Sequence, residues 1–392
     1  MVHVYGLSST AQSHVLTAAT IAADIASPNA ADVDQEGRFP DESMKAFADA
    51  GLYGLCLPRE VGGQGEGMRA FVGVVEELAG ACASTAMIYV MHTSAAQAIV
   101  NSTTFTDREA VLKEISNGRH LTTLAFSEAG SRSQFWAPVS RLEESNGHYL
   151  TSASKTWVTA AGHADSFISS AQRPNATSPL DSTVYFVRQN SKGVQLTSSF
   201  NGLGLRGNDS APVSLENIEV PSGSLISAQG EGPQMILEVI LPWFAIGTAA
   251  MANGLCRAAV QGTIKHLTET GFAHDGTKLR DLQNLRARLA EMSVRTEQSR
   301  SLLGHTLDQL ENPSGITPLF VLQSRLAALQ AAVDVTDLAM KTCGGAAFSR
   351  HLPIERFFRD ARAGWVMAPT VDHLHDFVGK ALTGLPLFSS DF

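Results

Sequence analysis

Six residues, Gly202–Gly207, satisfy the pattern G-x-G-x-x-G, which binds dinucleotide phosphates in many enzymes. The pattern works when a strand precedes it and a helix opens on it, because the helix N-terminus then faces the pyrophosphate. Here the segment that follows, NDSAPVSLENIEV, has the alternation of a strand. The sequence therefore argues against a Rossmann-type nucleotide site at these glycines.

Two histidines offer acid–base chemistry. His92 lies in the apolar segment IYVMHTSAAQA, and His373 follows Thr370 and Asp372. A histidine titrates near neutral pH and can serve as a base or as a hydrogen-bond donor. Each histidine can instead have a purely structural role. His92 would then be a buried, hydrogen-bonded helix residue, and His373 would belong with Asp372 to a solvated helix start. We keep both histidines as candidate catalytic residues.

Charge and cysteine usage exclude several classes of partner. The 29 basic and 38 acidic side chains give a net charge of −9 without any basic run, which opposes binding of nucleic acid or an anionic membrane surface. The four cysteines lie far apart and form no C-x-x-C pair, so we expect reduced thiols and no metal site. The sequence shows no signal peptide and no apolar stretch judged long enough to span a bilayer. We expect a cytoplasmic protein without membrane insertion.

Composition divides the chain into three zones. Residues 1–120 have the periodicity of helices, and residues 231–392 are helical again. Residues 121–230 are rich in Ser, Thr, Val and Asn, with alternating runs at Val184–Arg188 and Val213–Val220 that predict strands. A length of 392 residues suits two or three domains, and the order helices, strands, helices is uncommon enough to narrow the fold.

Local signals predict particular features within these zones. Asn146-Gly147 between two strand-like runs indicates a hairpin turn. The segment after residue 231 is apolar nearly all round, which predicts a central helix rather than a surface one. Pro242 within it predicts a kink or a helix start, because proline lacks the N–H that a helix interior needs.

Five segments, which occur along the chain in the order typical of a known family, carry a resemblance to it. LAFSEAGSRS (Leu124–Ser133), KTWVTAAGHAD (Lys155–Asp165) and GLGLRGNDSAPVSLENIEVP (Gly202–Pro221) resemble the middle domain of acyl-CoA dehydrogenases. PREVGGQG (Pro58–Gly65) resembles their N-terminal helix-domain loop, and KTCGGAAFSRHLPIERFFRDAR (Lys341–Arg362) their last-helix signature. The resemblance implies a mainly α protein with an N-terminal helical domain, a middle antiparallel β-barrel-like domain and a C-terminal four-helix bundle.

The same resemblance implies FAD as the cofactor. An isoalloxazine ring needs donors near N5 and its carbonyls, a flat partner and exclusion of water. Phe126 and Ser127 would contact the ring, and Ser133 keeps a family serine at the substrate thioester end. Trp157 and Thr159 match a Trp-x-Thr beside the ring and its N5. The ordinary alternative for Trp157 is a core aromatic residue on a strand.

In this family FAD reaches across a subunit interface, so the resemblance implies a homodimer or homotetramer. Gly344 and Gly345 match a Gly-Gly at the pyrophosphate, where missing side chains allow close approach, and Gln283 matches a family Gln. Thr370 matches a Thr on the adenosine side. The family Arg is absent from the aligned GFAHDG. Lys341 either supplies that positive charge or is a solvated helix lysine.

The main departure from the family concerns the glutamate that removes the substrate α-proton. In RDARAGWVMAPT its usual position is taken by Ala368, a substrate contact that has no group to accept a proton. The alternative family position, on the central helix, falls at Phe244 or a neighbour. Several stand-ins remain open. They are His92, which lies on a helix that by analogy lines the acyl pocket and so contacts substrate, His373 together with Asp372, and Glu238.

Three functions therefore stay open. The first is α,β-dehydrogenation of an acyl thioester, carried by CoA or a carrier protein, with an atypical base and a separate electron acceptor. The second is a monooxygenase that uses O2 with FMN or reduced flavin supplied by a flavin reductase. The third is a desulfinase-type or non-redox flavoprotein. We rank dehydrogenation first.

Overall fold

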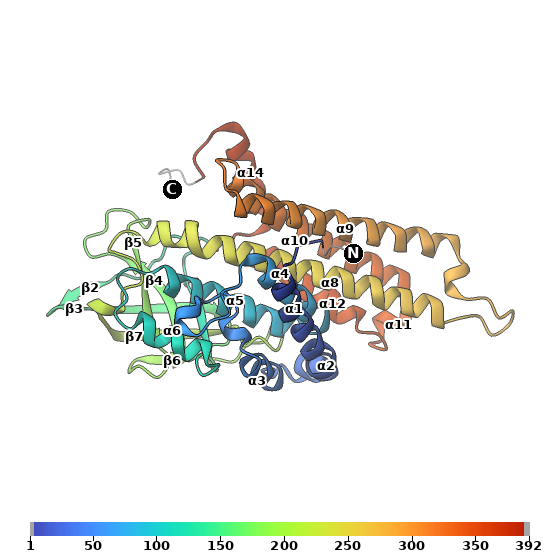
Figure 1. The fold of residues 1–392 in the computed structure, drawn as a ribbon, viewed down its shortest axis with the longest axis horizontal. Coiled ribbons are helices and arrows are strands. Elements are labelled where there is room, and N and C mark those ends of the chain that lie inside the picture. The colour runs from blue at the N-terminus through green and yellow to red at the C-terminus, as the bar shows by residue number, and fades with distance from the viewer. Residues whose placement is uncertain (1–3, 388–392) are drawn as a thin grey trace.

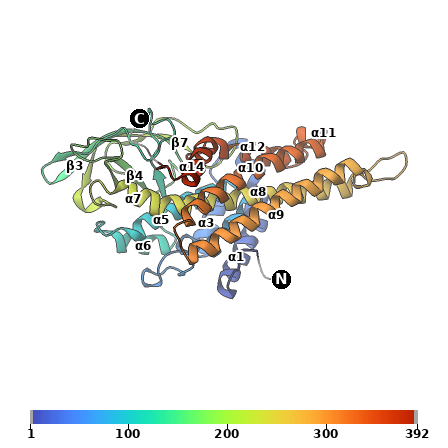
Figure 2. The same ribbon diagram turned by 90° about the horizontal axis from the view of Figure 1, so that it is seen from above.

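The computed structural model describes residues 4–387, and helices, strands and helices follow one another as predicted. Figures 1 and 2 show the strands gathered at one end, with the long C-terminal helices running away from them and the N-terminal helices packed alongside. The N-terminal helices are α1 (Ser9–Ile21), α2 (Ser27–Glu36), α3 (Asp41–Asp49), α4 (Met68–Ala81), α5 (Ala83–Asn101) and α6 (Arg108–Ser116).

The middle part of the chain forms two sheets. One has the order β1-β4-β5 and the other β2-β3-β7-β6. Their bounds are β1 (Thr122–Ala125), β2 (Glu143–Ser145), β3 (His148–Val158), β4 (Ser166–Gln172), β5 (Ser182–Arg188), β6 (Val194–Leu196) and β7 (Ala211–Pro221). The predicted antiparallel barrel-like arrangement needs correction, because the sheets do not close into a barrel and β1 pairs with β4 in parallel. The chain builds β2 and β3 between those two strands, which supplies the long connection that a parallel pair requires.

The local predictions in this region are confirmed. Asn146 and Gly147 join β2 to β3 with φ angles of 48° and 85°, which is the left-handed pair that a tight hairpin turn needs. The two alternating runs lie in β5 and β7. No helix opens on Gly202–Gly207, since β7 follows this loop directly among the described residues.

The C-terminal helices are α7 (Gly232–Gln234), α8 (Leu241–Glu269), α9 (Gln283–Glu311), α10 (Thr317–Cys343), α11 (Gly345–Phe348), α12 (Ile354–Ala361), α13 (Ala363–Val366) and α14 (Val371–Thr383). A π-helical segment, Met235–Ile240, leads into α8, and Pro242 lies in the first turn of α8 as predicted. Helix α8 packs against α4 as well as against α9 and α10, and α14 packs on α10. The helical stretch Gly232–Glu269 is, contrary to the sequence expectation, long and apolar enough to cross a membrane, although most of its apolar part is buried inside the protein.

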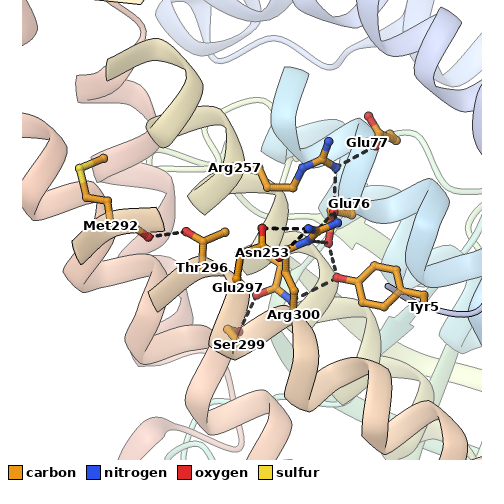
Figure 3. A network of polar contacts seen from close by, with 10 residues as sticks. All are labelled: Tyr5, Glu76, Glu77, Asn253, Arg257, Met292, Thr296, Glu297, Ser299 and Arg300. Carbon is orange, nitrogen blue, oxygen red and sulfur yellow. Dashed lines mark hydrogen bonds and ion pairs between the residues drawn. The ribbon is translucent and has the colours of Figure 1, made fainter. Parts of the chain in front are cut away.

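A buried carboxylate links the N-terminal segment to three helices (Figure 3). Glu76 on α4 is 1% exposed and accepts hydrogen bonds from Arg257 Nη1 on α8 at 2.7 Å and Arg300 Nε on α9 at 3.1 Å. The Tyr5 hydroxyl donates to the same carboxylate, and Asn253 Nδ2 donates to Tyr5 Oη at 3.3 Å. The network joins the helices of the N-terminal and C-terminal groups at one point.

Replacing Glu76 with alanine should lower the free energy of unfolding by about 3–5 kcal/mol, because two arginines then lose a buried partner. Glu77→Ala is the matched control. Glu77 follows Glu76 directly on α4, is 27% exposed and accepts from Arg257 Nη1 at 2.8 Å. The control should cost about 0–1 kcal/mol. Urea unfolding of both variants measures the difference, and equal losses would contradict a central role for Glu76.

Candidate active site

A cavity of about 810 Å³ lies where loops of the strand region meet the C-terminal helices. It brings together both motif segments found in the sequence, since residues 126–133 and Trp157 and Thr159 all line it. Residues 200–205, 240–241 and 365–368 close other sides. Among the predicted site residues, those in this cavity are Phe126, Ser127, Ser133, Trp157, Thr159 and Ala368.

A buried ion pair holds the two motif segments together. Lys155 Nζ lies 2.6 Å from Glu128 Oε1, and the two side chains are 0% and 3% exposed. The other Glu128 oxygen accepts from the backbone N–H groups of Val139 and Ser140, at 2.6 and 2.8 Å. Burial acts to raise the pKa of Glu128, but Lys155 and Ser140 outweigh it and hold that pKa below its usual value. Glu128 is the only carboxylate among the described residues that line the cavity, and it is fully committed to these partners.

Trp157 is aimed at the cavity by an irregularity of β3. The pairing of β3 with β7 shifts register between Lys155 and Val158, and Trp157 has a φ of 57°. A bulge of this kind redirects a side chain, and a left-handed tryptophan stores backbone strain of order 1–3 kcal/mol. The indole is 69% exposed although it lines a cavity, so it is available to a flat ligand. The core-aromatic alternative for this residue does not hold.

The loop Ser127–Ser133 offers backbone donors to the same space. Gly130, Arg132 and Ser133 have φ angles of 100°, 49° and 68°. Across residues 4–387, the N–H groups of these three residues and of Ser127 find no protein acceptor. Successive N–H groups in such turns form concave sites for electron-rich atoms. Together with the exposed indole, they suit a planar ring that carries carbonyl oxygens.

The opposite side of the cavity is apolar. It is formed by Met87 and Met91 of α5, Phe244 of α8, and Met367 and Ala368 after α13. The two positions where the sequence placed a missing base, Phe244 and Ala368, thus line one and the same cavity. Neither carries a proton acceptor.

His92 lies outside this cavity, which corrects the prediction that it acts as base or substrate contact. The side chain is fully buried, and its Nδ1 accepts from the Thr122 N–H at 3.2 Å. Its Nε2 therefore carries the proton and donates to the Tyr53 carbonyl, also at 3.2 Å. Burial lowers the pKa of His92 to about 4, so the ring is neutral at physiological pH. Both nitrogens serve the fold.

His373, Thr370 and Glu238 also lie outside the cavity. The Thr370 hydroxyl caps α14 by accepting from the His373 N–H at 3.3 Å, and the His373 ring packs edge-on against Trp136. Glu238 is exposed and accepts from Gln234 Nε2 at 3.1 Å. The helix cap and the exposed turn explain why these polar residues occur where they do, and none of the three is placed to move a proton in the cavity.

The remaining predicted residues form a second group at the far end of the helices. Gln283 begins α9, while Lys341 lies in the last turn of α10, so the antiparallel pair brings them to the same end. Arg288 Nη1 donates to the Lys341 carbonyl at 3.2 Å, and Gly344 and Gly345 follow at once. Figure 1 shows α11, which starts at Gly345, at the end of the helices away from the strands.

Sequence reasoning missed the loop 200–205 as a cavity wall, because it considered these glycines as a nucleotide motif and as part of the resemblance to the middle domain, but not as a wall of the site. Gly204 approaches α12 so closely that an added Cβ would lie 2.4 Å from the Arg359 carbonyl oxygen. The Leu205 N–H donates to Asp360 Oδ1 at 2.7 Å, and burial raises the pKa of Asp360 to about 6. Arg359 and Arg362 line the cavity as well. The segment RDAR (residues 359–362) of the last-helix signature could have indicated this wall, because its residues line the cavity or contact the loop.

The three successive parts of the chain match the three domains of one known protein family. Residues 9–119 match the N-terminal domain of acyl-CoA dehydrogenases, residues 123–218 the middle domain and residues 230–382 the C-terminal domain. The chain belongs to the acyl-CoA dehydrogenase family, a family of FAD-dependent oxidoreductases acting on CH–CH bonds.

Individual relatives agree with this assignment. The chain is 27% identical to acryloyl-CoA reductase (NADH) of Anaerotignum propionicum over 342 residues, which is 86% of this chain and 84% of that protein. It is also 27% identical to short-chain acyl-CoA dehydrogenase of Clostridium acetobutylicum, over 86% of this chain and 88% of that one. Butyryl-CoA dehydrogenase from Megasphaera elsdenii has the same fold, with a TM-score of 0.91 and 21% identity over 96% of this chain and 99% of the other.

Proposed function

We propose that this chain binds FAD in the cavity and dehydrogenates the Cα–Cβ bond of an acyl thioester, carried by CoA or a carrier protein. The observation that carries the proposal is that the exposed, strained Trp157 lines the same cavity as the open backbone donors. The names of the relatives, a short-chain acyl-CoA dehydrogenase and an acryloyl-CoA reductase, support a short acyl thioester as substrate. Bound flavin supplies the acceptor for the hydride that leaves the substrate.

The residues present fit the flavin ring. Trp157 provides a flat face, and the N–H groups of Ser127 and Gly130 provide donors for ring carbonyls. Thr159 Oγ1 lies 3.1 Å from Ser210 Oγ, so this hydroxyl is oriented by a neighbour beside the cavity. Phe126 and the methionine side of the cavity exclude water from the reacting carbons.

The same cavity lacks a fixed general base. Glu128 is held by Lys155, and Ala368 and Phe244 carry no acceptor. Removal of the α-proton therefore has no positioned partner within the described lining residues. General bases contribute about 10²–10⁴-fold to rate, so we expect slow dehydrogenation of ordinary acyl thioesters.

Anaerobic addition of short acyl-CoA thioesters should bleach the flavin slowly in the natural protein and faster in Ala368→Glu. The new carboxylate would stand in the cavity where a base is missing, and a gain of about 10-fold or more is expected. Ala368→Gln is the matched control, with the same size and no base, and it should show no gain. Stopped-flow absorbance measures the rate. Failure of every thioester to bleach either protein would contradict dehydrogenation.

A companion assay, run in air with a flavin reductase, separates the alternatives. Turnover that needs O2 and a flavin reductase, without bleaching by thioesters, would support a monooxygenase, for which the comparisons offer no support. Stable flavin binding with neither activity would support a desulfinase-type or non-redox flavoprotein.

We further propose that the second group of residues completes the cofactor site of another copy of the chain, as a homodimer or homotetramer. Gln283, Gly344 and Gly345 lie at the end of the helices away from the strands, which places them remote from the cavity of their own chain. Nothing within 4 Å would oppose a Cβ added at Gly344 or Gly345, so the backbone there is open to approach. Thr370 caps α14 by accepting from the His373 N–H, and its contact with the adenosine side of FAD stays a prediction.

Lys341→Ala should weaken FAD binding if its charge replaces the absent family arginine. Lys341 Nζ already pairs with Asp337 Oδ2 at 2.6 Å and is 61% exposed, so a loss of about 3-fold is expected. Lys45→Ala is the matched control, because Lys45 forms the same kind of pair with Asp49 at 2.6 Å on α3. FAD titration followed by flavin fluorescence measures both. Equal affinities for both variants would leave Lys341 a solvated helix lysine.

A further inference from the structure

Arg325 on α10 is a buried cation with almost no partners. Its side chain is 0% exposed, and only Nη2 makes a hydrogen bond, to the Met367 carbonyl at 3.1 Å. In the part of the chain that the structure describes, Nε and Nη1 have no hydrogen-bond partner. The guanidinium lies over the Phe244 ring, 4.8 Å from its centroid. The three N–H bonds of Nε and Nη1 are thus left for a group that the described chain does not provide.

This arrangement is costly for the folded chain alone. Burial lowers the pKa of Arg325 to about 9, which still leaves the group protonated near neutral pH, and no carboxylate contributes to that pKa. A buried charge without a partner destabilises a protein strongly, and buried arginines are normally paired. A ligand that brings an anion to Nε and Nη1 would remove this cost.

Arg325 lies next to the cavity, so a ligand of the cavity is the group that can reach it. Phe244, over whose ring it lies, and Met367, whose carbonyl it bonds, both line the cavity, and Ala368 follows Met367 directly. Arg325 therefore lies behind the apolar wall, on the side of the cavity that has no carboxylate of its own. The donors of Ser127–Ser133 and the indole of Trp157 form the other side.

We propose that this end of the cavity binds a carboxylate at the far end of the acyl group, with Arg325 as its partner. The inference rests on the proposed function and adds to it a substrate class: thioesters of dicarboxylic acids. The methionine and phenylalanine side chains take the methylene carbons between thioester and carboxylate. The planar carboxylate matches the guanidinium, which recognises such groups with directed hydrogen bonds. Arg325 acts as a specificity-determining residue and not as a base.

Selectivity follows from the same physics. A thioester that ends in a methyl group leaves Arg325 unpaired, whereas one that ends in a carboxylate satisfies it. Sites built to pair a polar group reject analogues that lack it far more strongly than apolar pockets reject a missing methylene. A preference of about 10-fold or more is therefore expected.

The test compares glutaryl-CoA with pentanoyl-CoA, whose acyl groups have the same number of carbons but end in a carboxylate and a methyl group. Calorimetric titration of the FAD-loaded protein without oxygen should give tighter binding of glutaryl-CoA, by about 10-fold or more. Arg325→Met should abolish the preference. It should also raise the melting temperature of the protein without thioester, because an unpaired buried charge is removed.

Arg188→Met is the matched control. Arg188 also lies over a phenylalanine ring, at 5.7 Å from the centroid of Phe186, but it does not line the cavity. This variant should bind both thioesters as the natural protein does. Equal affinity for the two thioesters in the natural protein overturns the inference and leaves the proposed function standing. Binding of neither overturns the inference, and binding of neither together with no bleaching by any thioester overturns both. A lower melting temperature for Arg325→Met would identify Arg325 as a structural residue and would also overturn it.

Discussion

The ion pair between Glu128 and Lys155 is the contact on which the site depends. One residue belongs to the loop after β1 and the other to β3, and both are buried with every polar atom of the carboxylate engaged. A satisfied pair of this kind fixes geometry, while loss of one partner leaves a buried charge that costs about 3–5 kcal/mol. Because Lys155 is anchored from within, the residues just after it form the bulge that turns Trp157 outward. The donor loop and the indole thus face one space.

The cavity has two chemically distinct sides. The strand side is polar, strained and held by the ion pair, and it suits a flat cofactor. The helix side is largely apolar, with the buried cation Arg325 behind Phe244 and Met367 and with Arg359 and Arg362 in the lining. His92, a candidate for acid–base chemistry, lies outside the cavity, and both of its ring nitrogens are hydrogen-bonded to backbone groups. The described lining of the cavity is therefore well suited to bind a flat cofactor, but it offers no free side chain placed to accept a proton.

The sequence predicted the fold, and it singled out the two segments that meet at the cavity, for identifiable reasons. SEAGS and KTWVT are local segments, and the hairpin at Asn146-Gly147 depends only on residues that tolerate left-handed backbone. His92 could not be placed correctly, since its ring partners, Tyr53 and Thr122, lie 39 and 30 residues away and bond through backbone atoms that no side-chain pattern reveals.

Two further features escaped the sequence because packing decides them. Arg325 sits in an apolar helical run, and periodicity alone does not tell whether such an arginine reaches solvent or points inward. The open sheets differ from the expected barrel because closure depends on register and crossover, which residue types do not fix. Trp157 has a left-handed φ that normally calls for glycine, so its exposure became evident only from the structure.

The most direct measurement of the central claim is the FAD affinity of Trp157→Ala compared with that of the natural protein and of Trp157→Phe. Since the indole is 69% exposed, its removal should leave the melting temperature of the protein without flavin nearly unchanged. If Trp157 stacks on the flavin, the alanine variant should bind FAD about 10-fold more weakly and quench its fluorescence less, with the phenylalanine variant in between. Unchanged affinity and quenching in Trp157→Ala would contradict a flavin site in this cavity.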